Sequence, residues 1–191
     1  MLESIIPSKA RRKILELFFH HPEEHYYLRK IVRDVGEEVN AVKRELDILS
    51  EAKLLHKERR LNKIFYTLNR SYTFYDEFLR IFTKSTPLAV AITQSLPKIG
   101  KVKFAAVSTK FSKKVPIKED EIYLLLVGNI VVPEIETIIA DSGAWFGRDI
   151  NYTVMTDDEF AFRKKNNDPF IWRFLRGPKI MLVGNEDELL K

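Results

Sequence analysis

The sequence predicts an α+β protein in two parts, a small helical domain that ends in a pair of strands and a larger domain in which strands and helices alternate. Apolar residues recur at helical spacing through most of the first 52 residues and then give way to two short strand-like runs. From residue 98 onward, short apolar runs alternate with amphipathic stretches. The length of 191 residues suits one ordinary domain or two small ones.

Composition narrows the class of protein. Hydrophobic residues make up 45% and charged residues 31% of the chain, as in globular proteins. Cysteine is absent, which excludes disulfides and thiolate metal sites. Apolar runs are too short for a membrane span, and the N-terminal residues lack the apolar core of a signal peptide. We therefore expect a cytoplasmic protein with no membrane partner, no cofactor and no bound metal.

Positive charge is concentrated near the N-terminus. Residues 1–72 hold 15 Lys and Arg against 11 Asp and Glu, while the remaining residues hold 17 against 16. The net charge of +5 thus lies mostly in the first third of the chain, which favours a polyanionic partner there.

Three helices are expected in the first domain. The first starts after the capping residue Ser8 and stops at His21-Pro22, the second spans Leu28–Val35 before Gly36, and the third runs from about Val39 to Ala52. The short aromatic run His25-Tyr26-Tyr27 is β-prone. An apolar stripe on the third helix comprises Val39, Val42, Leu46 and Leu49.

Two strands follow, Leu54–Glu58 and Ile64–Leu68, joined by the basic stretch ERRLNK. This order of elements is typical of a winged helix-turn-helix. NAVKRELDILSEAKLL (40–55) resembles the recognition helix of winged-helix regulators of the ArsR and MarR type, and HKERRLNKIFYTLN (56–69) resembles their wing. The resemblance covers residues 1–72 and implies a transcriptional regulator that binds double-stranded DNA.

The polar faces of these segments suit that role. Asn pairs well with adenine, and Arg or Lys with guanine. The candidate DNA-binding residues are Asn40, Ala41, Lys43 and Arg44 on the helix and Arg59, Arg60, Asn62 and Lys63 at the wing. Four acidic residues near the proposed face, Glu37, Glu38, Glu45 and Asp47, count against very tight binding. A solvated helix face, or a winged helix that binds protein, is the alternative interpretation.

Residues 73–97 are expected to form linking helices. A helix over 73–84 has Phe74, Phe78, Ile81 and Phe82 on one face, which would be core or would pack against a second subunit in a homodimer. Thr86-Pro87 breaks that helix, a further helix runs to about Leu96, and residues 97–100 turn the chain.

Residues 98–191 are expected to form a mixed α/β domain. The predicted strands are KVKFAAVS (101–108), EIYLLLVG (121–128), INYTVM (150–155) and KIMLVG (179–184), and the predicted helices are 133–140, 157–164 and 169–175. The strands FAAVS and EIYLLLVGN, with the later DPFIWRFLRGPKIMLVG, resemble the small nucleotidyltransferases of the DNA polymerase β superfamily.

The motifs that such an enzyme needs are altered. The resemblance implies a Gly-Ser pair after the first strand and an Asp-x-Asp that binds Mg²⁺ on the next. These fall on Val107-Ser108 and on Glu121-Ile122-Tyr123, and the third acid falls on Asn151, with Asp149 as an alternative. Since tyrosine supplies no carboxylate, we expect the chemistry to be lost.

A nucleotide or anion pocket could persist without catalysis. Its candidate residues are Ser108, Lys110, Glu121 and Tyr123, with Lys113 and Lys114 nearby. The sequence therefore predicts a DNA-binding regulator whose second domain is inactive and serves ligand sensing, partner binding or dimerisation. The alternatives are an active nucleotidyltransferase that its winged helix targets, and a protein-interaction module.

Overall fold

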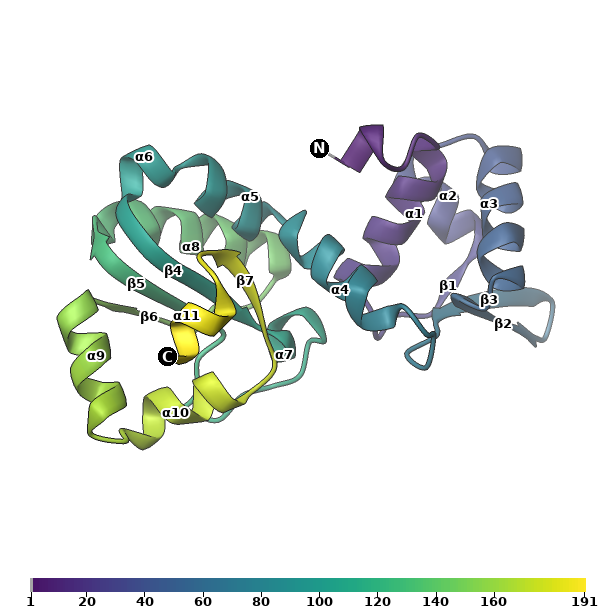
Figure 1. Ribbon diagram of the computed structural model, residues 1–191. Coiled ribbons are helices and arrows are strands. Elements are labelled where there is room, and N and C mark those ends of the chain that lie inside the picture. The colour runs from purple at the N-terminus through teal and green to yellow at the C-terminus, as the bar shows by residue number, and fades with distance from the viewer. Residues whose placement is uncertain (1) are drawn as a thin grey trace. The chain divides into compact units, whose positions relative to one another are not determined.

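The computed structural model describes residues 2–191 and divides into two compact units, one ending at Thr83 and the other beginning at Lys84 (Figure 1). The division falls inside the segment 73–97 that was expected to link two domains. Helices and sheets occur in both units, which confirms the α+β class. Among the described residues, no helix is both long enough and apolar enough to cross a membrane.

The first unit is a cluster of helices against a small sheet. Its elements are η1 (Leu2–Ser4), α1 (Lys9–His20), β1 (Tyr26–Tyr27), α2 (Leu28–Val35), α3 (Val39–Glu51), β2 (Leu55–Arg60), β3 (Lys63–Leu68) and α4 (Tyr75–Lys84). The described strands of this unit form an antiparallel sheet in the order β1-β3-β2. The expected order of helices and strands in residues 8–68 is confirmed.

Local chemistry sets the helix ends. The Ser8 hydroxyl accepts a hydrogen bond from the backbone N–H of Arg11 and so caps α1. Gly36 ends α2 with φ at +64°, in the left-handed conformation that glycine adopts without strain. Val42, Leu46 and other apolar side chains of α1 to α3 bury together in one core. Val39 is the exception to its predicted stripe, because it is 44% exposed.

Helix α4 belongs to the first unit rather than to a linker. Phe82 is fully buried there, and its ring stacks on Phe19 of α1 with the ring centroids 5.1 Å apart. The predicted stripe is only half right, since Phe74 lies just before the helix and is 54% exposed, and Ile81 is 42% exposed. The buried face instead includes Leu79.

The second unit is a sheet with helices on both faces. Its elements are α5 (Pro87–Gln94), α6 (Leu96–Ile99), β4 (Gly100–Ser108), α7 (Thr109–Ser112), β5 (Leu124–Ile130), α8 (Val132–Phe146), β6 (Tyr152–Met155), α9 (Asp157–Lys165), α10 (Pro169–Arg176), β7 (Lys179–Val183) and α11 (Glu186–Leu190). The described strands lie in the order β6-β5-β4-β7, with β5 and β6 parallel and the other neighbours antiparallel.

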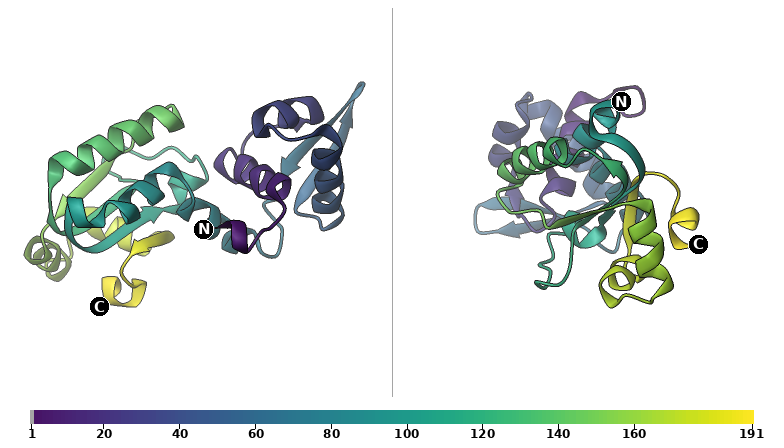
Figure 2. Two further views of the ribbon diagram at one scale, coloured as in Figure 1. Left: turned by 90° about the horizontal axis from the view of Figure 1, so that it is seen from above. Right: turned by 90° about the vertical axis from the view of Figure 1, so that its left-hand side faces the viewer.

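Two apolar layers hold this sheet. One contains side chains of α5 and α8, such as Ile92 and Ile135, and the other contains side chains of α9 and α10, such as Phe160 and Ile171. Figure 2 shows α8 on one side of the sheet and α9 and α10 on the other. The strands alternate between the layers, as expected for a sheet buried on both faces.

Several boundaries differ from the sequence prediction. Strand β5 begins at Leu124, three residues later than predicted, because residues 119–123 form a turn and an irregular approach to the sheet. Helix α8 extends to Phe146, six residues beyond its predicted end. Residues 96–99 form the short helix α6 where a turn was predicted, and the short helices α7 and α11 were not predicted.

Candidate nucleic-acid interface and the cavity of the second unit

Helix α3 begins with a carboxylate cap. Glu38 Oε2 accepts hydrogen bonds from the backbone N–H groups of Asn40 and Ala41, at 2.8 and 2.9 Å. Its Oε1 accepts one from Nδ2 of Asn40 at 3.1 Å. These hydrogen bonds lower the pKa of the Glu38 carboxyl, and the bond from the Asn40 backbone N–H has the largest effect. The amide donors of two predicted contact residues are therefore already satisfied within the chain.

The next turn of α3 presents exposed cations. Lys43 and Arg44 are both exposed, one turn into the helix. Asp47 is exposed on the same helix, and its carboxylate binds Lys57 Nζ at 2.9 Å across to strand β2. This ion pair raises the pKa of Lys57 and ties the helix to the hairpin.

Two of the acidic residues expected near this face are used elsewhere. Glu45 is only 3% exposed, and its carboxylate accepts hydrogen bonds from Ser8 Oγ and Arg11 Nε of the α1 region, both at 2.7 Å. Glu37 binds Lys13 Nζ at 2.7 Å and Lys9 Nζ at 3.1 Å, also on α1. Both carboxylates are thus paired with groups of the α1 region, although the sequence had placed them near the exposed face of α3.

The β2–β3 hairpin is tighter than its sequence indicated. Arg60 pairs with Lys63 at the last register position, so only Leu61 and Asn62 form the turn. Arg59, Arg60, Asn62 and Lys63 are all exposed. Arg60 binds Glu58 at 2.7 Å on its own strand. The hairpin thus carries cations on strand ends, where the backbone ladder fixes their positions.

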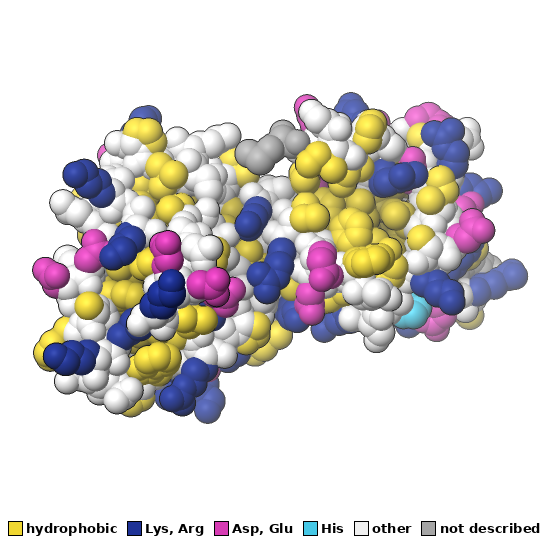
Figure 3. All heavy atoms as spheres, in the orientation of Figure 1, with side chains coloured by type: hydrophobic (Ala, Val, Ile, Leu, Met, Phe, Trp, Pro, Cys, Tyr) yellow, Lys and Arg dark blue, Asp and Glu magenta, His cyan; other side chains and the backbone are white. Residues whose placement is uncertain are grey.

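A groove of about 610 Å³ lies between α2, α3 and the hairpin. Its cationic lining residues are Arg29, Lys43, Lys57 and Lys63, and its carboxylate is that of Asp47. Figure 3 shows Lys and Arg side chains gathered over α3 and the hairpin, with some acidic side chains between them. Together these observations bring Lys43, Asn62 and Lys63 of the predicted set to one basic groove.

Sequence reasoning missed several groove residues. Arg29 is the second residue of α2. Lys57 and Arg59 are two positions apart and therefore lie on the same face of β2. Tyr27 also lines the groove, and the Nζ of Lys63 lies 4.6 Å from its ring centroid. The two-residue spacing of Lys57 and Arg59 was the signal in the sequence that could have indicated a basic face on this strand.

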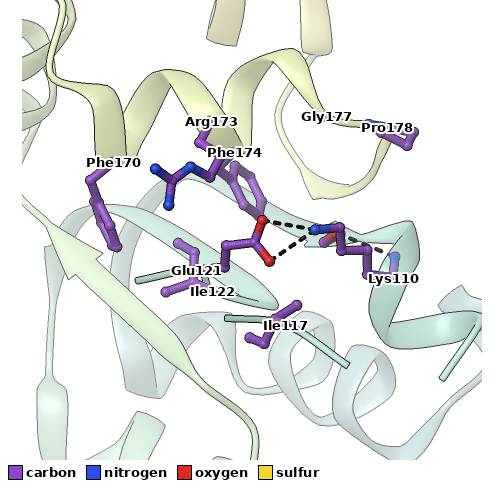
Figure 4. A pocket seen from close by; sticks show the side chains of 10 residues that line it. Lys110, Ile117, Glu121, Ile122, Phe170, Arg173, Phe174, Gly177 and Pro178 are labelled. Atoms are coloured by element: carbon purple, nitrogen blue, oxygen red, sulfur yellow. Dashed lines mark hydrogen bonds and ion pairs between the residues drawn. The ribbon is translucent and has the colours of Figure 1, made fainter. Parts of the chain in front are cut away.

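The second unit has a small cavity at the predicted pocket. Lys110 Nζ binds both carboxylate oxygens of Glu121, at 2.8 and 2.9 Å (Figure 4). The backbone N–H of Lys118 donates to the same carboxylate at 3.1 Å. Both hydrogen bonds lower the pKa of the Glu121 carboxyl, and the bond from Lys110 has the larger effect. Ser108 also lines the cavity, and its hydroxyl caps α7 by accepting from the N–H of Lys110.

Residues of α10 also line the cavity. Arg173 of α10 lines it and forms a salt bridge with the neighbouring Asp120. The enclosed space is about 40 Å³, whereas sites for small organic ligands measure about 300–1,000 Å³. In this conformation the cavity has room for water molecules but not for a nucleotide.

Tyr123 does not line this cavity, contrary to the prediction. Its ring is 6% exposed and packs edge-on against Phe111, with centroids 5.4 Å apart. Its hydroxyl donates to the carbonyl of Val115 at 3.0 Å, and the Arg148 guanidinium lies 5.0 Å from its ring centroid. Because β5 starts only at Leu124, Glu121 and Tyr123 do not share a strand face as an Asp-x-Asp pair would.

The remaining predicted residues are also separate from the cavity. Lys113 and Lys114 do not line it. The side chains of Asp149 and Asn151 are exposed, and the carbonyl of Asn151 accepts from the N–H of Tyr123. Within residues 2–191, no three His, Cys, Asp or Glu side chains are grouped so that they could hold a metal ion.

Comparison of the chain with protein-family models, with curated proteins and with solved structures found no match.

Proposed function

We propose that the first unit is a winged helix-turn-helix domain that binds double-stranded DNA, and that the chain is a transcriptional regulator. The order α1-β1-α2-α3-β2-β3 supports the fold, with α3 as the recognition helix and β2–β3 as the wing. The short connection between α2 and α3, which Gly36 begins in a left-handed conformation, is typical of the helix-turn-helix.

The observation that carries this proposal is the separation of charges around α3. Glu45 and Glu37 turn toward α1 and bind its cations and Ser8, while Lys43 and Arg44 stay exposed. The exposed side of α3 then carries Lys43 and Arg44 together with Asp47, whose carboxylate is bound by Lys57. Cations placed on a helix that fits the major groove attract phosphates and can also read guanine edges.

The contacts divide into two kinds. Lys43 and Arg44 are assigned to the major groove, where a guanidinium such as that of Arg44 can pair with guanine through two hydrogen bonds. Arg59, Arg60 and Lys63 are assigned to phosphates beside the wing, and they set affinity more than base preference. Asn40 is engaged by Glu38 and must release that carboxylate before it can pair with adenine.

For the second unit we propose a nucleotidyltransferase-like domain without catalytic activity. Tyr123 supports this, because its phenol is buried and bonded to Val115 where the resemblance requires a metal-binding carboxylate. The carboxylate of Glu121 supports it as well, because Lys110 already binds both of its oxygens. Such a domain would serve ligand sensing, partner binding or dimerisation. In the first unit, Phe74 and Ile81 offer exposed apolar surface for a homodimer.

A chemical-shift titration tests the DNA-binding proposal. The ¹⁵N-labelled chain is titrated with a random-sequence duplex, and amide shifts are followed residue by residue. The proposal expects shifts in α3 and around residues 59–63, with the amides of β4 and β5 unchanged. Shifts confined to the second unit, or an absence of shifts at low salt, would refute it.

A further inference from the structure

The tip of the wing carries an exposed leucine in a strained conformation. The side chain of Leu61 is 95% exposed, the highest value among the large apolar side chains of the described residues. Its φ of +51° lies in the left-handed region, which glycine and asparagine adopt far more readily than leucine. Both features cost stability, and neither brings the side chain into contact with a core.

The surroundings of Leu61 indicate the kind of partner that would cover it. Arg60 and Lys63 are paired in register directly below the turn, and Arg59 is the next residue along β2. All three side chains are exposed. An apolar tip with cations on the two strands behind it fits a polyanion that also offers an apolar recess. Duplex DNA has this combination in its minor groove, where phosphates flank the stacked base edges and sugars.

We propose that Leu61 enters the minor groove and wedges against a base step when the wing binds DNA. This inference rests on the DNA-binding proposal above and adds a specificity-determining residue to it. Proteins that bind the minor groove often insert apolar side chains between base steps, and the basic residues beside them hold the phosphates. The hairpin supplies both parts, with the apolar side chain at its apex and the cations on the strands behind it.

The wedge predicts a particular base preference. Guanine places its N2 amino group in the minor groove, where it obstructs an apolar side chain, whereas A·T pairs have no such group. Inosine lacks this amino group but keeps the major-groove pattern of guanine, so replacing G·C by I·C pairs changes only the groove that Leu61 is proposed to enter. The contacts of α3 in the major groove are the same on both duplexes.

The test compares Leu61→Asn with wild type on matched G·C and I·C duplexes, using the full chain and fluorescence anisotropy. Wild type should bind the I·C duplex more tightly. Leu61→Asn should lose about tenfold in affinity for the I·C duplex, the lower end of what burial of a leucine side chain contributes. It should also bind both duplexes alike. Its salt dependence should stay unchanged, because no charge has been removed.

Two further variants control for structure and exposure. Leu61→Met keeps an apolar side chain and should retain the preference for I·C. Ile5→Asn removes another exposed apolar side chain, 76% exposed, which directly follows η1 and is not part of the hairpin. This variant should bind as wild type does. Thermal melting of Leu61→Asn should give the wild-type Tm or a higher one, because asparagine relieves the left-handed strain.

The possible failures can be told apart. If wild type shows no salt-dependent binding to either duplex, the DNA-binding proposal and this inference both fall. If wild type binds DNA but Leu61→Asn binds the I·C duplex equally well, only the wedge is refuted. A loss of binding by Leu61→Asn that is equal on the two duplexes would also overturn it, since the minor groove would then not be the site of contact.

Discussion

Replacing Glu45 by glutamine should destabilise the first unit while leaving the second unchanged. The carboxylate is buried, and it joins α3 to α1 through Ser8 and the guanidinium of Arg11. Glutamine has the same shape but a single acceptor oxygen and no charge. It therefore cannot accept from both donors as the carboxylate does, and the charge of Arg11 loses its partner.

The magnitude follows from the two bonds. Hydrogen bonds to charged groups contribute about 1.5–3 kcal/mol each and neutral ones about 0.5–1.5. The side chain of Arg11 is 38% exposed, so water compensates part of its loss. A net cost of about 1.5 kcal/mol results, which corresponds to about a tenfold increase in the local opening of α1 and α3.

Hydrogen–deuterium exchange of the full chain measures that opening. Peptides from α1 and α3 should exchange about tenfold faster in Glu45→Gln, under conditions where exchange reports the opening equilibrium. Urea unfolding followed by tryptophan fluorescence should not change, because Trp145 and Trp172 both belong to the second unit. Glu51→Gln alters an exposed carboxylate at the end of the same helix and is the matched control. Exchange in Glu45→Gln no faster than in this control would refute the reasoning.

The same pair has a pH dependence with a defined sign. Burial raises the pKa of Glu45, but the bonds from Ser8 and Arg11 outweigh it, and the net pKa lies below the ordinary value. A depressed pKa means that the stabilisation is present above the unfolded-state value of about 4.3 and is lost as pH falls through the folded-state value. The difference between wild type and Glu45→Gln should thus be full at neutral pH and shrink below about pH 4.

Four further outcomes are expected. Arg44→Ala should relax base preference at one position of a selected site, measured by binding to a panel of single-base variants, whereas Arg60→Ala should weaken binding to all duplexes and reduce the salt slope by about one unit; equal behaviour of both variants and wild type would contradict the assigned contacts. Tyr123→Phe should destabilise the second unit by about 1 kcal/mol, because the carbonyl of Val115 loses its buried donor, and an unchanged urea midpoint by tryptophan fluorescence would contradict that role. The chain should transfer no labelled nucleotide from any of the common ribonucleoside triphosphates with Mg²⁺ or Mn²⁺, and metal-dependent incorporation would reinstate the enzyme hypothesis.

Local signals in the sequence predicted most elements of the first unit. Ser8 caps its helix and Gly36 ends another, because capping depends on residues only a few positions apart. Apolar periodicity likewise predicted the buried side of α3 through Val42 and Leu46. These features need no knowledge of distant segments.

The features that the sequence did not predict depend on contacts between residues that are far apart in the chain or on the pairing of two strands. Glu45 finds its partners 37 and 34 positions earlier, so the helix pattern alone left its carboxylate near the exposed face. The hairpin turn is shorter than predicted because Arg60 and Lys63 are still paired between β2 and β3. Composition does not reveal such a register.

The candidate cavity shows the same limit. Ser108, Lys110 and Glu121 were predicted to lie together and do, since they flank neighbouring strand ends. Tyr123 was grouped with them on the assumption of a continuous strand from residue 121. The strand begins at Leu124, and the irregular backbone of residues 121–123 places the phenol in a different apolar layer.

A salt titration of the wild-type chain with a random-sequence duplex tests most directly whether the first unit binds DNA. Fluorescence anisotropy would give the affinity at several salt concentrations between about 50 and 200 mM. If Arg59, Arg60 and Lys63 each neutralise a phosphate, the logarithm of affinity should fall with the logarithm of salt with a slope of about −2.7 or steeper. Binding that is absent at the lowest salt, or that does not change with salt, would contradict a DNA-binding role, and the basic groove would then have to meet a protein.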